Sequence, residues 1–195
     1  MLDPLPCATY AFVMSITPGP NNVMLTAAGA NFGLRRTLPH ILGVSCGFTS
    51  LVAAVCCGLG ALFTRWPQLH LALKWAGAAY LLYLGWQLLR ARGAAAGEAA
   101  KPVTFAEAAA FQYLNPKAWV MSMTAATLFL PSQLGQLLAS SFVTAIVAVV
   151  NLPCITAWAL FGSSLRLTLT RPVARRVFNW LMAGALAATG VMMVA

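Results

Sequence analysis

The stretch Thr17-Pro18-Gly19-Pro20-Asn21-Asn22 interrupts an apolar run that extends from about Leu5 to Thr26. Proline lacks the backbone N–H that a helix needs and clashes with the carbonyl four residues earlier, so two prolines around a glycine should open the helix. In hydrocarbon the freed carbonyls are costly unless they face protein or a water-filled cavity. The stretch therefore predicts a broken helix whose second part begins near Asn21 or Asn22, both good N-cap residues.

The rest of the chain has the composition of a membrane protein. Apolar residues make up 61% of the sequence and charged residues 8%, whereas a soluble domain carries about 25% charged residues. A helix needs about 20 apolar residues to cross a bilayer. We therefore expect an all-α membrane protein with six transmembrane helices, at about residues 5–26, 38–63, 69–89, 108–130, 137–162 and 177–194. A polar cluster at residues 131–136 is the predicted turn between the fourth and fifth helices.

The positive charges fall into two unequal groups when six helices alternate in direction. One side of the membrane then holds Arg65 and Lys74. The other side holds the remaining ten basic residues, which are Arg35, Arg36, Arg90, Arg92, Lys101, Lys117, Arg166, Arg171, Arg175 and Arg176. The positive-inside rule makes this second side cytoplasmic and places both termini in the periplasm. Because the first residues include an acid, Asp3, and no base, we expect the first apolar run to be retained rather than cleaved as a signal.

A linker with little to pack, residues 91–104, divides the chain near its midpoint. We expect a first three-helix repeat at 1–90, a cytoplasmic linker at 91–104 and a second three-helix repeat at 105–195, all in one membrane domain. Because each half has an odd number of helices, the second half would enter the membrane from the opposite side. Two such halves would form an inverted repeat, an architecture common in secondary transporters.

A second interruption, Asn115-Pro116-Lys117, lies in the fourth predicted helix at a place that matches the first. The N-terminus of a broken helix carries a partial positive charge that suits a carboxylate. The predicted substrate-binding residues are Thr17, Pro18, Gly19, Pro20, Asn21, Asn22, Asn115, Pro116, Lys117 and Asn151. Lys117 has two interpretations: it contacts a substrate carboxylate, or its side chain extends to the cytoplasmic interface. The stretch Asn151-Leu152-Pro153 either lines the same cavity or kinks the fifth helix.

Other patterns limit the chemistry. None of the three acids lies in the middle of a predicted helix, so Glu107 and His40 are the candidates for proton coupling. The five cysteines lie in apolar runs without CxxC spacing, and we expect buried thiols without a disulfide framework. We expect no metal, no cofactor and no enzymatic activity, because no ligand cluster, phosphate-binding loop or nucleophile–base pair is present. The basic residues flank apolar runs, which argues against nucleic-acid binding. The small residues from Gly43 to Gly47 predict close helix packing.

Three motifs resemble the LysE/RhtB family of amino-acid exporters. The first is Thr17-Pro18-Gly19-Pro20-Asn21, followed by Gly33 and Arg35-Arg36. The second is Asn115-Pro116-Lys117 after the apolar segment Phe105 to Leu114. The third runs from Trp75 to Leu81, with Gly85 and Trp86 after it. The chain length, the six apolar runs and the central linker fit the family along the whole sequence.

The resemblance implies a secondary transporter that exports amino acids or close derivatives across the bacterial inner membrane, driven by the proton gradient. Its partners would be the amino-acid substrate and the lipid bilayer, with a homo-oligomer left open. Few acids are available to pair with a cationic side chain, so we expect a neutral or small polar substrate. The alternatives are a small-ion or metal exporter, a redox membrane protein that uses Cys46 and Cys154, and a non-transporting assembly subunit.

Overall fold

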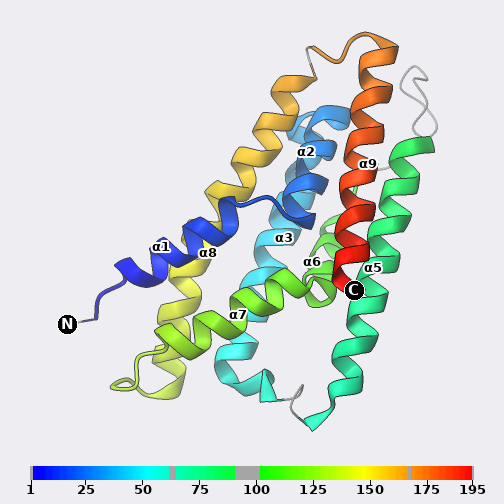
Figure 1. Ribbon diagram of the computed structural model, residues 1–195. Helices are drawn as coiled ribbons and strands as arrows, with labels where there is room; N and C mark the ends of the chain where they lie inside the picture. Colours follow the sequence, from blue (N-terminus) through cyan, green and yellow to red (C-terminus); the bar gives the residue numbers. More distant parts are fainter. Residues whose placement is uncertain (1, 62–64, 91–101, 167, 195) are drawn as a thin grey trace.

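All regular structure in the described part of the chain is helical. The computed structural model describes residues 2–61, 65–90, 102–166 and 168–194 (Figure 1). Its helices are α1 (Leu5–Ile16), α2 (Pro20–Phe32), α3 (Leu34–Ala54), the π-helical turn η1 (Val55–Leu59), α5 (Pro67–Arg90), α6 (Phe105–Leu114), α7 (Pro116–Phe129), α8 (Gln136–Leu165) and α9 (Pro172–Val194). Three stretches, α3 with η1, α8 and α9, are long and apolar enough to cross a membrane.

Many large apolar side chains lie on the outside of the molecule. Val149, Leu137 and Met192 are 73%, 78% and 79% exposed. Lipid tails are as apolar as these side chains, so such a surface suits a bilayer. Four tryptophans are also exposed, and tryptophan is enriched where membrane helices meet water: Trp66, Trp75, Trp86 and Trp180. The helices and their surface together are those of an all-α membrane protein.

Two pairs of short helices replace the first and fourth predicted helices. Helices α1 and α2 have 12 and 13 residues, and α6 and α7 have 10 and 14. At about 1.5 Å per residue, none of them alone spans the roughly 30 Å of a bilayer core. The pairs are interrupted at residues 17–19 and at Asn115. Both predicted proline interruptions are therefore confirmed.

Small residues bring the helices together in three close pairs. Gly29 and Gly162 lie at the crossing of α2 and α8, where an added Cβ would overlap the backbone of the other helix. Gly43 and Gly47 lie in the same way against α6, which confirms the predicted close packing of this segment. Gly85 of α5 lies close to Ala183 of α9, and Gly190 of α9 lies close to Ala78 of α5. These close approaches fix the two broken helices against the long helices α3 and α8.

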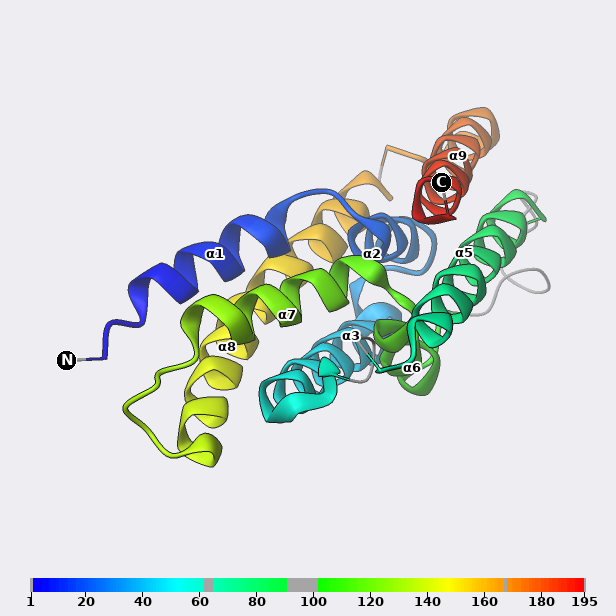
Figure 2. The same ribbon diagram turned by 60° about the horizontal axis from the view of Figure 1, so that its bottom comes forward.

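The contacts also fix the relative directions of the helices. Along α1–α2 and α8, Ser15 contacts Asn151 and Thr26 contacts Trp158, so residue numbers rise together and the helices run parallel. The same holds for α3 and α6, where Gly43 lies by Phe105 and Gly47 by Ala109. Helices α5 and α9 run antiparallel, because Gly85 approaches Ala183 while Gly190 approaches Ala78. Figure 2 shows α1 and α7 side by side, with α5 and α9 on the other side of the molecule.

The predicted loop between the first two helices does not exist. Helix α2 continues to Phe32, and α3 begins at Leu34, so Gly33 alone connects them. Gly33 has φ of 78°, a conformation that glycine adopts without a steric penalty. The expected boundaries at Thr26 and Leu38 are therefore wrong, because a sharp reversal at one glycine replaces a polar loop.

The connections gather at two ends of the molecule (Figure 1). The α2–α3 junction, the end of α5 and the α8–α9 connection lie at the upper end, and η1 and residues 130–135 lie at the lower end. Residues 130–135 cover the predicted turn except Gln136, which begins α8, and the turn is confirmed. The arginines next to the upper connections are Arg35, Arg36, Arg90, Arg166, Arg171, Arg175 and Arg176. Most of the predicted 91–104 linker, with Arg92 and Lys101, lies outside the described residues.

Candidate functional site

The first break exposes the carbonyl end of α1. Helix α1 stops at Ile16, Thr17 is extended with ψ of 143°, and α2 starts at Pro20 with Gly19 as its N-cap. Proline suits the first position of a helix, where no intrahelical partner for its missing N–H exists. The predicted N-cap at Asn21 or Asn22 is wrong, because Pro20 already begins the helix and no side chain caps it.

Side chains from other elements bind the carbonyls that the break frees. Asn22 Nδ2 donates to the Ser15 and Thr17 carbonyls, at 2.9 and 2.8 Å. Trp158 Nε1, from α8, donates to the Ile16 carbonyl at 3.1 Å. Such bonds matter in a membrane, where an unpaired carbonyl has no water to bind. The conformation of the first break therefore depends on side chains of α2 and α8.

The second break is shorter and caps itself. Asn115 is at once the C-cap of α6 and the N-cap of α7, and its side chain accepts a hydrogen bond from the Lys117 N–H at 3.1 Å. Pro116 occupies the first position of α7, as Pro20 does in α2. One extended residue is enough to separate the two helices here. Lys117 follows in the first turn of α7, and its side chain extends away from this turn toward the first break.

Lys117 joins the two breaks. Its Nζ donates to the Thr17 carbonyl at 2.9 Å, to Thr17 Oγ1 at 3.0 Å and to the Pro18 carbonyl at 3.3 Å. A lysine ammonium has three donors, and here each one has an acceptor. The side chain therefore extends to the first break. Among the described residues, no carboxylate pairs with this ammonium.

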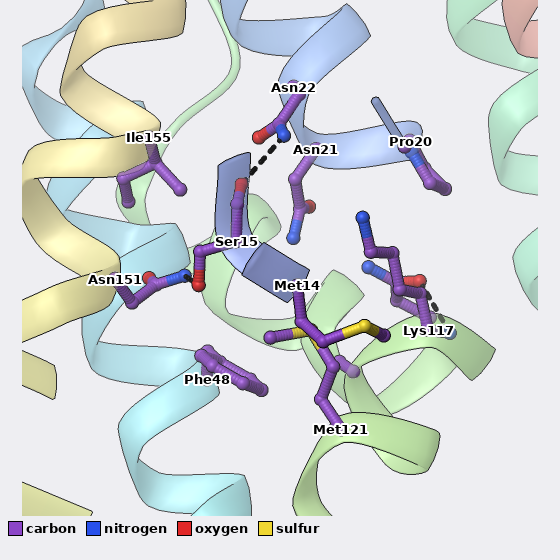
Figure 3. Close-up of a pocket in the computed structure, with 13 residues that line it drawn as sticks. Met14, Ser15, Pro20, Asn21, Asn22, Phe48, Lys117, Met121, Asn151 and Ile155 are labelled. Atoms are coloured by element: carbon purple, nitrogen blue, oxygen red, sulfur yellow. Dashed lines mark hydrogen bonds between the residues drawn. The ribbon is translucent and has the colours of Figure 1, made fainter. Parts of the chain in front are cut away.

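A cavity of about 340 Å³, open to solvent, lies where the breaks meet. Figure 3 shows Asn22, Ser15 and Asn151 on one side of the cavity and Lys117 on the other. The predicted site residues that line it are Gly19, Pro20, Asn21, Asn22, Asn115, Lys117 and Asn151. Thr17 and Pro18 are not part of the lining, but their carbonyls bind Lys117. Pro116 is also outside the lining and occupies the first position of α7.

Asn151 brings α8 into the site. Its Nδ2 donates to Ser15 Oγ at 3.0 Å, and its Oδ1 is buried with no partner among the described residues. Helix α8 continues through Pro153, and Asn151 lines the cavity.

A pair of amides connects α2 with α6 beside the cavity. Asn21 Nδ2 donates to Gln112 Oε1 at 2.8 Å, and Gln112 Nε2 donates to Asn21 Oδ1 at 3.1 Å. Gln112 is fully buried and also binds the Ala108 carbonyl. The pair holds Asn21 in place. It also connects α2, the helix after the first break, to α6, the helix before the second break.

Sequence reasoning missed the apolar side of the cavity and two polar partners. Met14, Phe48, Met121 and Ile155 line the cavity together with Ser15 and Ala118. Gln112 and Trp158 support it from behind. No local signal separates these apolar residues from ordinary core. Gln112 and Ser15 could have been predicted as site residues, because each is a polar residue close to a proline break.

The two candidates for proton coupling lie away from the cavity lining. Glu107 accepts hydrogen bonds from the Thr104 N–H and hydroxyl, at 2.8 and 2.9 Å, in a capping box that starts α6. His40 is fully buried on α3, and neither ring nitrogen has a partner among the described residues. All five cysteines are free thiols. Cys46 and Cys57 are exposed, so the expected burial is wrong for these two, which lie on the outer faces of α3 and η1.

Comparison with known proteins agrees with this architecture. The chain matches the family model described as LysE type translocator over residues 12–195. It is 34% identical to a cysteine/O-acetylserine efflux protein of Klebsiella pneumoniae over 95% of this chain and 94% of the relative. It is 31% identical to the Escherichia coli K12 protein of the same name over 79% of each chain. No solved structure matches the chain. These relatives are transporters and not enzymes, and the chain belongs to the LysE-type translocator family.

Proposed function

We propose that this protein exports small neutral amino acids or close derivatives from the cytoplasm, and that its cavity binds the substrate. The observation that carries the proposal is the meeting of two broken helices at a cavity, where the first break presents the carbonyls that hold Lys117 and the start of α2 presents uncapped N–H groups. A zwitterionic amino acid needs this combination. The names of the relatives, cysteine/O-acetylserine efflux proteins, make cysteine and O-acetylserine the first substrates to test.

The two charged groups of the substrate would bind at opposite ends of the first break. The start of α2 has no side-chain cap, so its free N–H groups and its partial positive charge suit a carboxylate. The carbonyls of Thr17 and Pro18, together with Asn151 Oδ1, suit an ammonium group. Asn21, Asn22 and Asn115 would hold these surfaces in place. Met14, Phe48 and Met121 would then contact a small apolar or thiol side chain.

The fold supports a six-span arrangement with two inverted repeats. The parallel pairs α1–α2 with α8 and α3 with α6, and the antiparallel pair α5 with α9, agree with six spans that alternate in direction. The arginines near the upper connections support a cytoplasmic location for that end by the positive-inside rule, which would put both termini in the periplasm of an inner-membrane protein. Rocking of one half against the other would then expose the cavity to each side in turn.

The proton gradient is the proposed driving force, with His40 and Glu107 as candidates outside the cavity. A small-ion or metal exporter has less support, because no group of three or more His, Cys, Asp and Glu side chains is clustered in the described residues. A redox function has less support because Cys46 is exposed and Cys154 is buried in another helix. An assembly subunit without transport would show no flux.

Reconstituted protein tests the proposal directly. Proteoliposomes loaded with unlabelled L-cysteine, kept reduced, should take up external radiolabelled cysteine by exchange, whereas protein-free liposomes should not. Unlabelled O-acetylserine should compete, and lysine should compete much less. Absence of exchange with any neutral amino acid would refute the proposal. Reporter fusions at both termini should be active only in the periplasm, and cytoplasmic activity would refute the orientation.

A further inference from the structure

The three acceptors around Lys117 make a site for a primary ammonium group. Two are carbonyls at the C-terminal end of α1, where the helix dipole is negative, and the third is a hydroxyl of the same break. The amino group of an amino acid is a primary ammonium too, with the same three donors. The Lys117 side chain therefore occupies, in this structure, the acceptors that suit the amino group of a substrate.

We propose that Lys117 is the proton-coupling group of the exporter: its protonated amine competes with the substrate amino group for the carbonyls of Thr17 and Pro18. This inference rests on the proposed function and names the group through which the proton acts. When Nζ loses its proton, it keeps two donors and gains a lone pair, so it no longer satisfies three acceptors. The substrate ammonium then replaces it.

The direction of transport follows from this competition. On the cytoplasmic side Lys117 releases its proton, and the substrate binds at the carbonyls. On the more acidic outer side Nζ takes up one proton, returns to the carbonyls and displaces the substrate. One proton enters for each amino acid that leaves, and no covalent bond of the substrate changes.

Lys117 is the candidate for proton binding that lies in the lining of the cavity. Among the described residues that line the cavity, it alone is titratable or charged. Helix α2 carries no titratable side chain. The elements packed against α7 carry Tyr10, Arg35, Arg36, His40, Glu107, Tyr113 and the thiols of α1, α3, η1 and α8, and none of these lines the cavity. A proton carried by His40 or Glu107 would have no direct contact with the substrate.

The test compares wild-type protein with Lys117→Met in proteoliposomes. Methionine keeps the length of the side chain and removes both the charge and the proton. Lys74→Met is the matched control, because Lys74 lies on α5 away from the cavity. Two quantities are measured for each protein: the apparent Km for cysteine exchange at acid and neutral pH, and the accumulation of cysteine against its gradient under an imposed pH difference.

The wild-type and Lys74→Met proteins should accumulate cysteine, and their apparent Km should rise at acid pH. Lys117→Met should show no proton-driven accumulation and no pH dependence, and its Km at acid pH should be about tenfold lower, because the competitor is gone. Persistent proton-driven accumulation in Lys117→Met would overturn the inference. A higher Km at both pH values would also overturn it, because that result assigns Lys117 to the substrate carboxylate.

A measurement on the wild-type protein covers the case in which Lys117→Met does not fold. Binding of cysteine to purified protein in weakly buffered detergent should release about one proton per bound molecule near neutral pH. If binding releases no proton between about pH 6 and about pH 8, the inference is wrong. Failure of the wild-type protein to exchange cysteine or any other neutral amino acid would instead refute the proposed function.

Discussion

The two breaks differ in how their backbone is satisfied, although they occupy matching places in the two halves. The first spans residues 17–19, and its carbonyls are bound by side chains from α2, α7 and α8. The second is the single residue Asn115, which caps α7 by itself. The first break therefore presents acceptors and depends on distant contacts, whereas the second presents a donor, Lys117, from a locally stable turn. Equivalent positions in a repeated architecture can thus take complementary roles.

The largest expected effect comes from closing the first break. In the double variant Pro18→Ala/Pro20→Ala, α1 and α2 can join, which would remove the free carbonyls and the cavity around them. Cysteine exchange in proteoliposomes should fall to the level of empty liposomes, while the amount of protein in the membrane stays the same. A normal exchange rate would mean that the broken helix is not the binding site.

The contact that holds the first break against α8 should be the next most sensitive. An added Cβ at Gly162 would overlap the backbone of Thr26, which cannot rotate away. Gly162→Ala should lower the free energy of unfolding by about 3 kcal/mol, measured by thermal unfolding in detergent. Gly184→Ala is the control, because an added Cβ there meets nothing within 4 Å. Equal stability of the two variants would show that α2 and α8 are not closely packed.

The difference between the breaks also predicts unequal stability effects for their asparagines. Asn22 donates two hydrogen bonds in a buried place, so the isosteric change Asn22→Asp removes both donors and adds a buried charge. It should destabilise the protein by about 2 kcal/mol or more. Asn115→Ala removes one cap and should cost about 1 kcal/mol. The reverse order in thermal unfolding would contradict the assignment of the first break as the one that depends on distant contacts.

Much of the fold was readable from the sequence, because a bilayer leaves few choices. The low charge content and the apolar runs predicted an all-α membrane protein, and Pro18, Pro20 and Pro116 predicted where helices break. Each proline removes a donor at a defined position, so the signal is local and strong. The α2–α3 junction was predicted wrongly, because the expected boundaries left a loop between Thr26 and Leu38 whereas the single residue Gly33 makes the reversal.

The site was predicted in its polar half only. Lys117, Asn22 and Asn151 stand out as polar residues in apolar runs, and all three line the cavity. Phe48 and Ile155 look like any other core residue, since which face of a helix meets a cavity depends on packing between distant segments. The role of Asn22 was also misjudged. It lies in the first turn of α2, but its amide reaches back to α1 because Pro20 has already started the helix.

Substrate affinity should respond to the unpaired oxygen on α8, which belongs to neither break. Asn151 Oδ1 is buried and free among the described residues, and Asn151 lines the cavity beside Ser15. A hydrogen bond to a charged group contributes about 1.5–3 kcal/mol, so Asn151→Leu should weaken cysteine binding by about tenfold or more. Equilibrium binding of radiolabelled cysteine measures this change. Thr156→Val, on the exposed side of the same helix, is the control and should bind cysteine as the wild type does.

The smallest expected effect tests whether the two breaks are energetically connected. Asn21 and Gln112 exchange two hydrogen bonds, so a double-mutant cycle with Asn21→Ala and Gln112→Ala should give a coupling energy of about 1 kcal/mol in thermal unfolding. The pair Asn31–Asn179 is a suitable comparison, because it joins α2 to α9 through one bond and lies outside the cavity lining. Both cycles should show coupling in stability, but only the Asn21–Gln112 cycle should show coupling in cysteine affinity. Coupling in affinity for both pairs would mean that α2 moves as a rigid body, and that the breaks communicate through the whole helix and not through this contact.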